Sequence, residues 1–139
     1  MNKAKTLSLK KEIEEKIRVF LRDRQEIIFA YIFGSFSKSD AFNDIDLAIY
    51  IDNHKLLKDD ATFYEVELSI DMEKIIKIPV DVVILNKASP QIVSIASRGV
   101  LVKDEDEGIR VDFITLNWKK YWELQAKVKE HIQALKDEN

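Results

Sequence analysis

Cysteine is absent from this chain of 139 residues, and glycine and proline are scarce, at three and two residues. Without cysteine there are no disulfide bonds and no thiolate metal sites, and a reducing compartment is expected. So few glycines and prolines leave little room for long flexible linkers. No apolar run is long enough to span a bilayer, and segment 1–11 is polar, without the apolar core of a signal peptide. We therefore expect a cytoplasmic protein that makes no membrane contact.

A large excess of charge of either sign is also lacking. Lysine and arginine number 22 against 25 aspartates and glutamates, which gives a formal net charge of -3. Domains that bind DNA or RNA are usually basic, so we expect no direct nucleic-acid binding. The length predicts a single domain over residues 1–139, with a core at about 8–104 and a C-terminal helix at about 105–137.

The hydrophobic pattern predicts an α/β domain in which helices cover a small sheet. Apolar runs of strand length occur at 27–33, 44–52, 80–85 and 100–102. Apolar residues at helical spacing predict helices at 8–24, 57–77, 89–98 and from 107 to the end. Segment 66–72 also alternates as a strand would, but the length of 57–77 without glycine or proline favours a helix. Ser8 is the expected N-cap of the first helix.

The most informative motif joins a Gly-Ser pair to two aspartates. Gly34 and Ser35 close one apolar run, and Asp44 and Asp46 open the next. Gly34 permits backbone conformations closed to other residues and lets a phosphate approach the chain. If a helical turn begins at Ser35, its free N–H groups and hydroxyl face an anion. Lys38 lies one turn later and could neutralise a phosphate, although a solvated lysine is the simpler interpretation of this residue alone.

Three acidic residues form a candidate metal site. On a strand, Asp44 and Asp46 point to the same side, about 6–7 Å apart at ~3.3 Å per residue. Asp81 lies among five aliphatic residues of the third predicted strand, where a charge is costly unless it is paired or bound to metal. If the two strands are neighbours, three carboxylates can hold two metal ions for phosphoryl or nucleotidyl transfer. Each feature alone fits a solvated turn or strand end, and the combination favours a site.

Four segments resemble the minimal nucleotidyltransferase (MNT) family, a small branch of the DNA polymerase β-like superfamily. They are residues 33–39, 43–49, 80–88 and 95–102. The hallmark of that family is Gly-Ser, a spacer and Asp-x-Asp, with a third acidic residue on a later strand. The resemblance covers roughly residues 25–105. The spacer between Ser35 and Asp44 has eight residues where ten is common, Ser39 replaces a usual glycine, and Lys38 replaces a frequent arginine.

The resemblance implies the polymerase β-like fold, with a small mixed sheet flanked by helices and a long C-terminal helix. It implies a magnesium-dependent enzyme, with two Mg²⁺ ions, that acts as an antitoxin. Such a protein transfers AMP from ATP to a tyrosine hydroxyl of a HEPN-type ribonuclease toxin, usually encoded beside it, and can form a hetero-oligomer with it. The implied residues are Asp44, Asp46 and Asp81 for catalysis and metal binding, and Gly34, Ser35 and Lys38 for nucleotide binding. The alternative is an antitoxin that neutralises its partner by binding alone.

The final predicted helix carries an apolar stripe. Its members recur at three- and four-residue steps: Val111, Ile114, Trp118, Tyr121, Gln125, Val128, Ile132 and Leu135. Because aromatic residues are common interface anchors, this stripe either binds a partner or packs on the domain's own sheet. Trp122 lies off the stripe, so one of the two tryptophans is expected to be exposed. His54, His131 and the charged run 103–107 are interpreted as surface residues.

Overall fold

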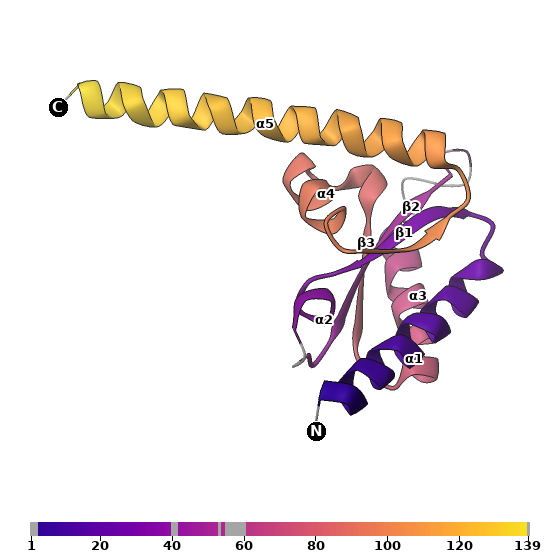
Figure 1. Cartoon of the computed structure of the whole chain (residues 1–139). Coiled ribbons are helices and arrows are strands. Elements are labelled where there is room, and N and C mark those ends of the chain that lie inside the picture. Colours follow the sequence, from indigo (N-terminus) through magenta and orange to yellow (C-terminus); the bar gives the residue numbers. More distant parts are fainter. Residues whose placement is uncertain (1–2, 40–41, 53, 55–60, 139) are drawn as a thin grey trace.

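The computed structural model of the chain describes residues 3–39, 42–52, 54 and 61–138 (Figure 1). The elements in chain order are α1 (Lys3–Arg22), β1 (Ile27–Phe33), α2 (Ser35–Lys38), β2 (Ile45–Ile51), α3 (Ala61–Ile76), β3 (Val80–Ile84), the 3-10 turn η1 (Leu85–Lys87), α4 (Pro90–Ala96), β4 (Val100–Asp104) and α5 (Glu107–Asp137). The predicted mixed α/β architecture is therefore confirmed. Part of the helix predicted at 57–77, residues 57–60, lies outside the described residues.

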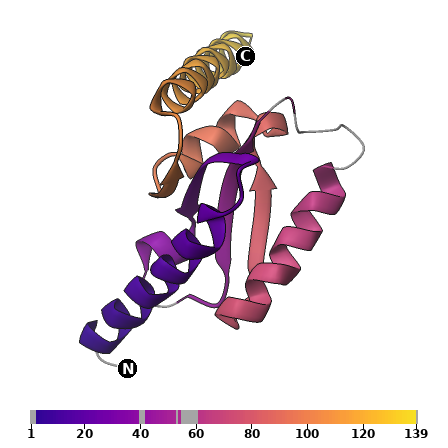
Figure 2. The same ribbon diagram turned by 90° about the vertical axis from the view of Figure 1, so that its right-hand side faces the viewer.

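The four strands form one mixed sheet in the order β3-β2-β1-β4. Strand β1 runs antiparallel to both β2 and β4, whereas β2 and β3 are parallel. The parallel pair is possible because α3 returns the chain to the end of the sheet at which β2 begins, and β3 starts from there. Helices α1 and α3 cover one face of the sheet, and α4 and α5 cover part of the other (Figure 2).

Each face of the sheet buries its own apolar core. On the first face, side chains of α1 and α3 such as Ile17 and Met72 pack against Leu47 of β2. On the second face, Phe29 stacks on Tyr50 with ring centroids 4.9 Å apart, and both rings contact α5. Burial on both faces explains why the strands read as continuous apolar runs rather than as alternating patterns.

Helix α3 also covers the outer edge of the sheet, along strand β3. The backbone N–H of Val80 donates to the Glu73 carboxylate at 2.9 Å, and that of Ile84 donates to Glu65 at 3.2 Å. The Ser69 hydroxyl donates to the carbonyl of Val80. Carboxylates of a helix thus replace the neighbouring strand that these N–H groups would otherwise need.

Two sequence-based expectations about α1 and β4 are wrong. Helix α1 begins at Lys3, so Ser8 lies inside the helix and is not its N-cap. Lysine and alanine are good helix formers, which allows the helix to extend toward the N-terminus. Lys103 is buried in β4 rather than solvated, and its ammonium group donates to the carbonyls of Leu21 at 2.8 Å and Arg24 at 2.7 Å. Each of these carbonyls also accepts a backbone N–H, from Arg24 and Ile27 respectively, so Lys103 adds a second, charged donor to both and ties β4 to the end of α1.

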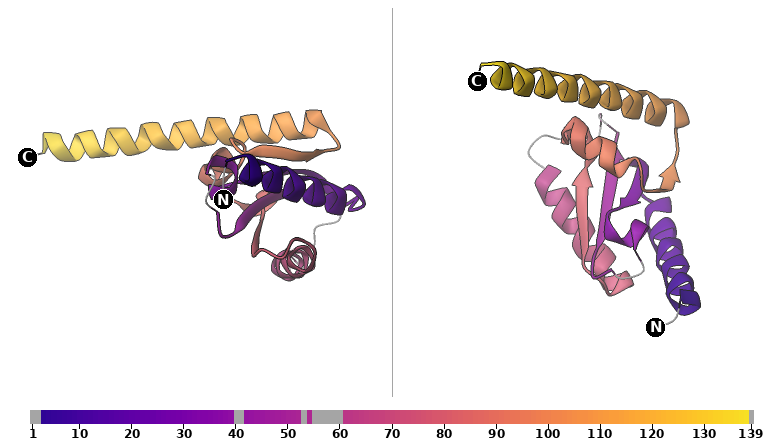
Figure 3. Two further views of the ribbon diagram at one scale, coloured as in Figure 1. Left: turned by 60° about the horizontal axis from the view of Figure 1, so that its bottom comes forward. Right: turned by 60° about the vertical axis from the view of Figure 1, so that its left-hand side comes forward.

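Helix α5 contains 31 residues, which corresponds to about 46 Å at 1.5 Å per residue. Its first part packs on the second core through Phe113 and Ile114. From Trp122 to Glu138 every residue is exposed, and Figures 1 and 3 show this half extending beyond the rest of the domain. The stripe is therefore partly covered by the domain at Ile114, Trp118 and Tyr121, and it is exposed at Val111 and throughout its second half. One of the two tryptophans was expected to be exposed, and it is Trp122, at 68%.

No helix in the described part of the chain combines the length and the apolar character that crossing a membrane requires.

Candidate active site

Gly34 connects β1 to α2 in a conformation that only glycine adopts readily. Its φ is 77° and its ψ is -153°, in a region essentially restricted to glycine. A Cβ atom added to Gly34 would lie 2.3 Å from Oδ2 of Asp46. The backbone of Gly34 therefore lies directly against the Asp46 carboxylate, and both the backbone angles and the lack of space require a glycine here.

The carboxylates of Asp46 and Asp81 come from adjacent strands. These residues are directly paired in the parallel ladder between β2 and β3. Side chains of residues paired in this way project from the same face of the sheet. Ala48 and Tyr50 follow Asp46 at two-residue steps and belong to the second core. The two carboxylates thus lie on the face that carries α4 and α5. Asp81 is exposed and Asp46 only half-buried, so they lie beyond the part that the helices cover.

Electrostatic repulsion links the third aspartate to this pair. Asp44 lies one residue before β2 and is half-buried. The pKa of Asp46 is raised, first by burial and then by the negative charges of Asp44 and Asp81. A divalent cation would relieve such repulsion, so the chemistry of this donor set fits magnesium. Among the described residues, no three carboxylate, histidine or cysteine side chains are already arranged to hold a metal ion. Metal binding by these aspartates stays a prediction.

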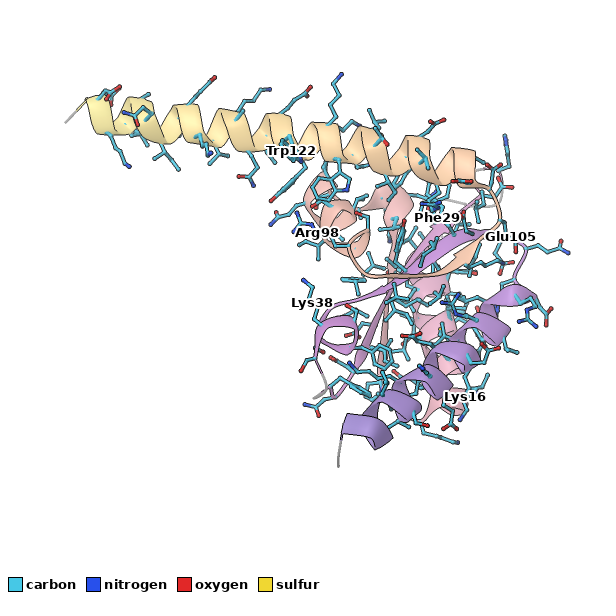
Figure 4. The ribbon with its side chains drawn as sticks, in the orientation of Figure 1. Lys16, Phe29, Lys38, Arg98, Glu105 and Trp122 are labelled. Carbon is cyan, nitrogen blue, oxygen red and sulfur yellow. The ribbon has the colours of Figure 1, made fainter. Side chains whose placement is uncertain are left out.

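The predicted helical turn at Ser35 is present as the short helix α2. Phe36 anchors it, because this side chain is buried in the first core and contacts Phe42 with ring centroids 4.6 Å apart. Ser35 and Lys38 remain exposed. In Figure 4, Lys38 extends from α2 into the space below the projecting half of α5. The predicted nucleotide-binding role of Ser35 and Lys38 remains a prediction.

Sequence analysis missed Arg98, which lies in the turn after α4. Its guanidinium group lies over the ring of Trp118, 4.8 Å from the centroid, and the indole N–H of Trp118 donates to the Ser97 hydroxyl at 3.0 Å. A groove of about 460 Å³ lies between Arg98 and α5, where Trp122 and Lys129 also line it. The four-residue spacing of the two tryptophans was the sequence signal for this groove, but nothing local indicated that Arg98 would join them.

Known proteins provide an independent comparison. Residues 15–108 match the family model for polymerase beta nucleotidyltransferases. No curated protein matches the sequence. A solved toxin-antitoxin structure with AMP-PNP aligns over 88% of this chain and 97% of its own, at 24% identity and a TM-score of 0.71.

Two further solved structures share the fold. A tri-AMPylated HEPN toxin in complex with its MNT antitoxin, from Shewanella oneidensis, aligns over 91% of this chain and 98% of the matched chain. The identity is 23% and the TM-score 0.69. The toxin-antitoxin MntA-HepT aligns over 90% and 97%, at 22% identity and a TM-score of 0.68. The family match spans more than half of the sequence and includes every predicted site residue. The chain therefore belongs to the polymerase β nucleotidyltransferase family.

Proposed function

We propose that this protein is a magnesium-dependent adenylyltransferase that acts in the cytoplasm as an antitoxin, by transferring AMP from ATP to a tyrosine hydroxyl of a HEPN-type toxin. The observation that carries the proposal is the position of Asp46, which lies against the Gly34 backbone and pairs in register with Asp81. Solved structures of the same fold include an MNT antitoxin with an AMPylated HEPN toxin and a toxin-antitoxin with AMP-PNP, which supports this choice of substrate.

Each residue of the site has a distinct role in the proposal. Asp44, Asp46 and Asp81 would hold up to two Mg²⁺ ions, which supply positive charge to the triphosphate and to the attacking oxygen. Gly34 leaves room for the Asp46 carboxylate to lie against the chain, and Ser35 would donate a hydrogen bond to the phosphates. Lys38 offers a positive charge on an exposed side chain.

The reaction is a substitution at the α-phosphorus of ATP. The tyrosine oxygen forms a bond to this phosphorus, and the bond to the oxygen that bridges to the β-phosphate breaks. The hydroxyl proton of the tyrosine would pass to the Asp81 carboxylate, and pyrophosphate departs. The product is a phosphodiester between AMP and the toxin, which adds a bulky anion to the modified tyrosine.

The test is transfer of label to the purified HEPN-type protein encoded beside this chain. With magnesium, we expect label from α-³²P-ATP to appear on that protein, and none from γ-³²P-ATP, because pyrophosphate leaves. The Asp44→Ala/Asp46→Ala variant should transfer less than about 1% of the wild-type amount, since it lacks the central carboxylates. Asp112→Ala is the matched control, because Asp112 is an exposed aspartate on α5 and should leave transfer unchanged. Absence of transfer by the wild-type protein, or equal transfer by the double variant, would refute the proposal.

Binding without catalysis is the second candidate function. It is favoured by the half of α5 that extends beyond the domain, because such a surface can mask a partner without any chemistry. This alternative predicts that Asp44→Ala/Asp46→Ala still protects cells from the toxin at matched expression. Loss of protection in that variant selects the enzymatic mechanism.

A further inference from the structure

The projecting half of α5 continues the apolar stripe of the packed half. Ile114 packs in the second core, and Gln125, Val128 and Ile132 continue its spacing beyond the domain. Val128 and Ile132 each expose 47% of their surface. The segment 122–137 is about 24 Å long at 1.5 Å per residue, and an isolated helix of this length is only marginally stable in water. A helix with this stripe gains stability when another apolar surface covers it.

Most charges of the projecting half are sorted by helix face, although Lys127 lies among the acidic residues of the face opposite the stripe. Glu123, Glu130 and Asp137 follow one another at seven-residue intervals, so they share one face, opposite the stripe. Lys129 and Lys136 are also seven residues apart, and they flank the stripe. A helix lying along the stripe would therefore meet lysines at its edge, while the acidic side chains point away from it.

The groove between Arg98, in the turn after α4, and helix α5 adds to the same flank. Arg98 brings another positive charge, and Trp118 and Trp122 bring aromatic surface. Lys129 lines the groove as well as the stripe, so the two are continuous. In Figure 4, Arg98 and Trp122 lie together between the domain and the projecting helix. The combined surface is apolar along its centre, aromatic at the end nearest the domain and basic along one side.

We propose that this surface, the projecting half of α5 with its groove, docks a helix of the toxin, and that this helix carries an apolar face flanked by acidic side chains. The identity of the partner rests on the proposed function. Charge argues against a second copy of the chain, because antiparallel pairing would place Lys129 and Lys136 of one copy opposite those of the other. The stripe lies on the same side of α5 as the residues that pack on the sheet. The sheet face that they cover is the one from which Asp46 and Asp81 project. A docked toxin therefore lies on the side of the carboxylates.

Two single substitutions on α5 test the docking surface with the full-length chain. Ile132→Glu places a charge in the stripe, whereas Ala134→Glu places the same side chain on another face of the same helix turn. The probe is the purified HEPN-type protein encoded beside this chain, with affinity measured by calorimetry. We expect Ile132→Glu to weaken binding roughly 30-fold or more, as for an interface hot spot. Ala134→Glu should stay within about twofold of wild type, since it lies off the contact.

A second variant tests the charge argument. Lys129→Glu/Lys136→Glu should weaken binding most at low ionic strength, and the difference from wild type should shrink in high salt. Melting temperatures near that of the wild-type protein establish that the variants remain folded. Because this pair leaves the apolar stripe intact, it keeps the docking proposal testable even if Ile132→Glu changes the helix itself.

The outcomes separate docking from catalysis. Unchanged affinity in Ile132→Glu and in the double lysine variant would overturn the docking proposal, even if AMP transfer is observed. A concentration-dependent dimer of the chain alone, abolished by Ile132→Glu, would overturn it by assigning the stripe to a second copy. Complete absence of binding by the wild-type chain would also overturn it. If binding depends on the stripe but wild-type protein transfers no AMP, docking stands and only the proposed enzymatic function fails.

Discussion

Substitution of Gly34 by alanine tests the central contact of the candidate site. At a φ of 77° and a ψ of -153°, an alanine backbone costs about 1–3 kcal/mol. The new methyl group would also lie 2.3 Å from Oδ2 of Asp46, well inside van der Waals contact. The carboxylate must therefore move by roughly 1 Å, a displacement that can cost on the order of 100-fold in rate.

We expect Gly34→Ala to lower both the stability and the activity of the protein. For a domain of this size, 1–3 kcal/mol corresponds to a fall in melting temperature of roughly 3–12 °C, measured by calorimetry or circular dichroism. The initial rate of AMP transfer, measured with α-labelled ATP, should fall by about 100-fold. The stability measurement stands independently of the reaction, because it depends only on backbone angles and on the contact with Asp46.

Gly108→Ala is the matched control. Gly108 lies in the first turn of α5, and a Cβ added there would have one neighbour, Oδ1 of Asp106, at 3.4 Å. Alanine favours helix over glycine by up to about 1 kcal/mol, so this variant should melt at or above the wild-type temperature. In an Asp46→Ala background, Gly34→Ala should cost less, since the carboxylate is gone. This account of the site would be contradicted if Gly34→Ala had wild-type stability and rate. It would also be contradicted if the substitution lowered stability equally in the wild-type protein and in Asp46→Ala.

Three further substitutions probe other features. Asp46→Asn should abolish AMP transfer but raise stability at neutral pH, by less than about 1 kcal/mol because solvent screens the half-exposed group. The pKa of Asp46 is raised in the fold, so its ionisation destabilises the folded protein as pH rises. The gain from Asn should therefore vanish in melts at acid pH, where the aspartate is protonated. Lys103→Met should cost about 1–3 kcal/mol in urea unfolding, because the carbonyls of Leu21 and Arg24 each lose a charged donor and keep only a backbone N–H, whereas exposed Lys119→Met should be neutral. Gly99→Ala should cost at least about 3 kcal/mol or prevent folding, since its Cβ would lie 2.0 Å from the carbonyl oxygen of Ile32; wild-type unfolding would disprove the close approach.

The strands were predictable from the sequence because both of their faces are buried. The run 27–33 coincides with β1, the run 44–52 contains β2 with one extra residue at each end, and the run 80–85 contains β3 with one extra residue at its end. Continuous apolar segments of this length have few alternatives to a covered strand. Helix boundaries were predicted less well, since good helix formers extended α1 beyond its expected N-cap.

The sequence singled out Asp46 and Asp81, which the structure brings side by side, but it did not predict how they meet. Sequence spacing placed Asp44 and Asp46 together, but the register that pairs Asp46 with Asp81 depends on how α3 returns the chain. The burial of Lys103 was missed because its partners lie about 80 residues away in the sequence. The sequence also could not predict that α5 projects beyond the domain. An apolar stripe has the same residue pattern whether the domain or another protein covers it.

The carboxylates that α3 offers to β3 have a consequence for how this protein can assemble. An open strand edge invites another polypeptide to extend the sheet, which is a common route to uncontrolled aggregation. Here Glu65 and Glu73 already occupy two amides of that edge, so an incoming strand would first have to displace charged groups. The domain thereby discourages sheet extension on this side, and it leaves recognition of other molecules to its helices.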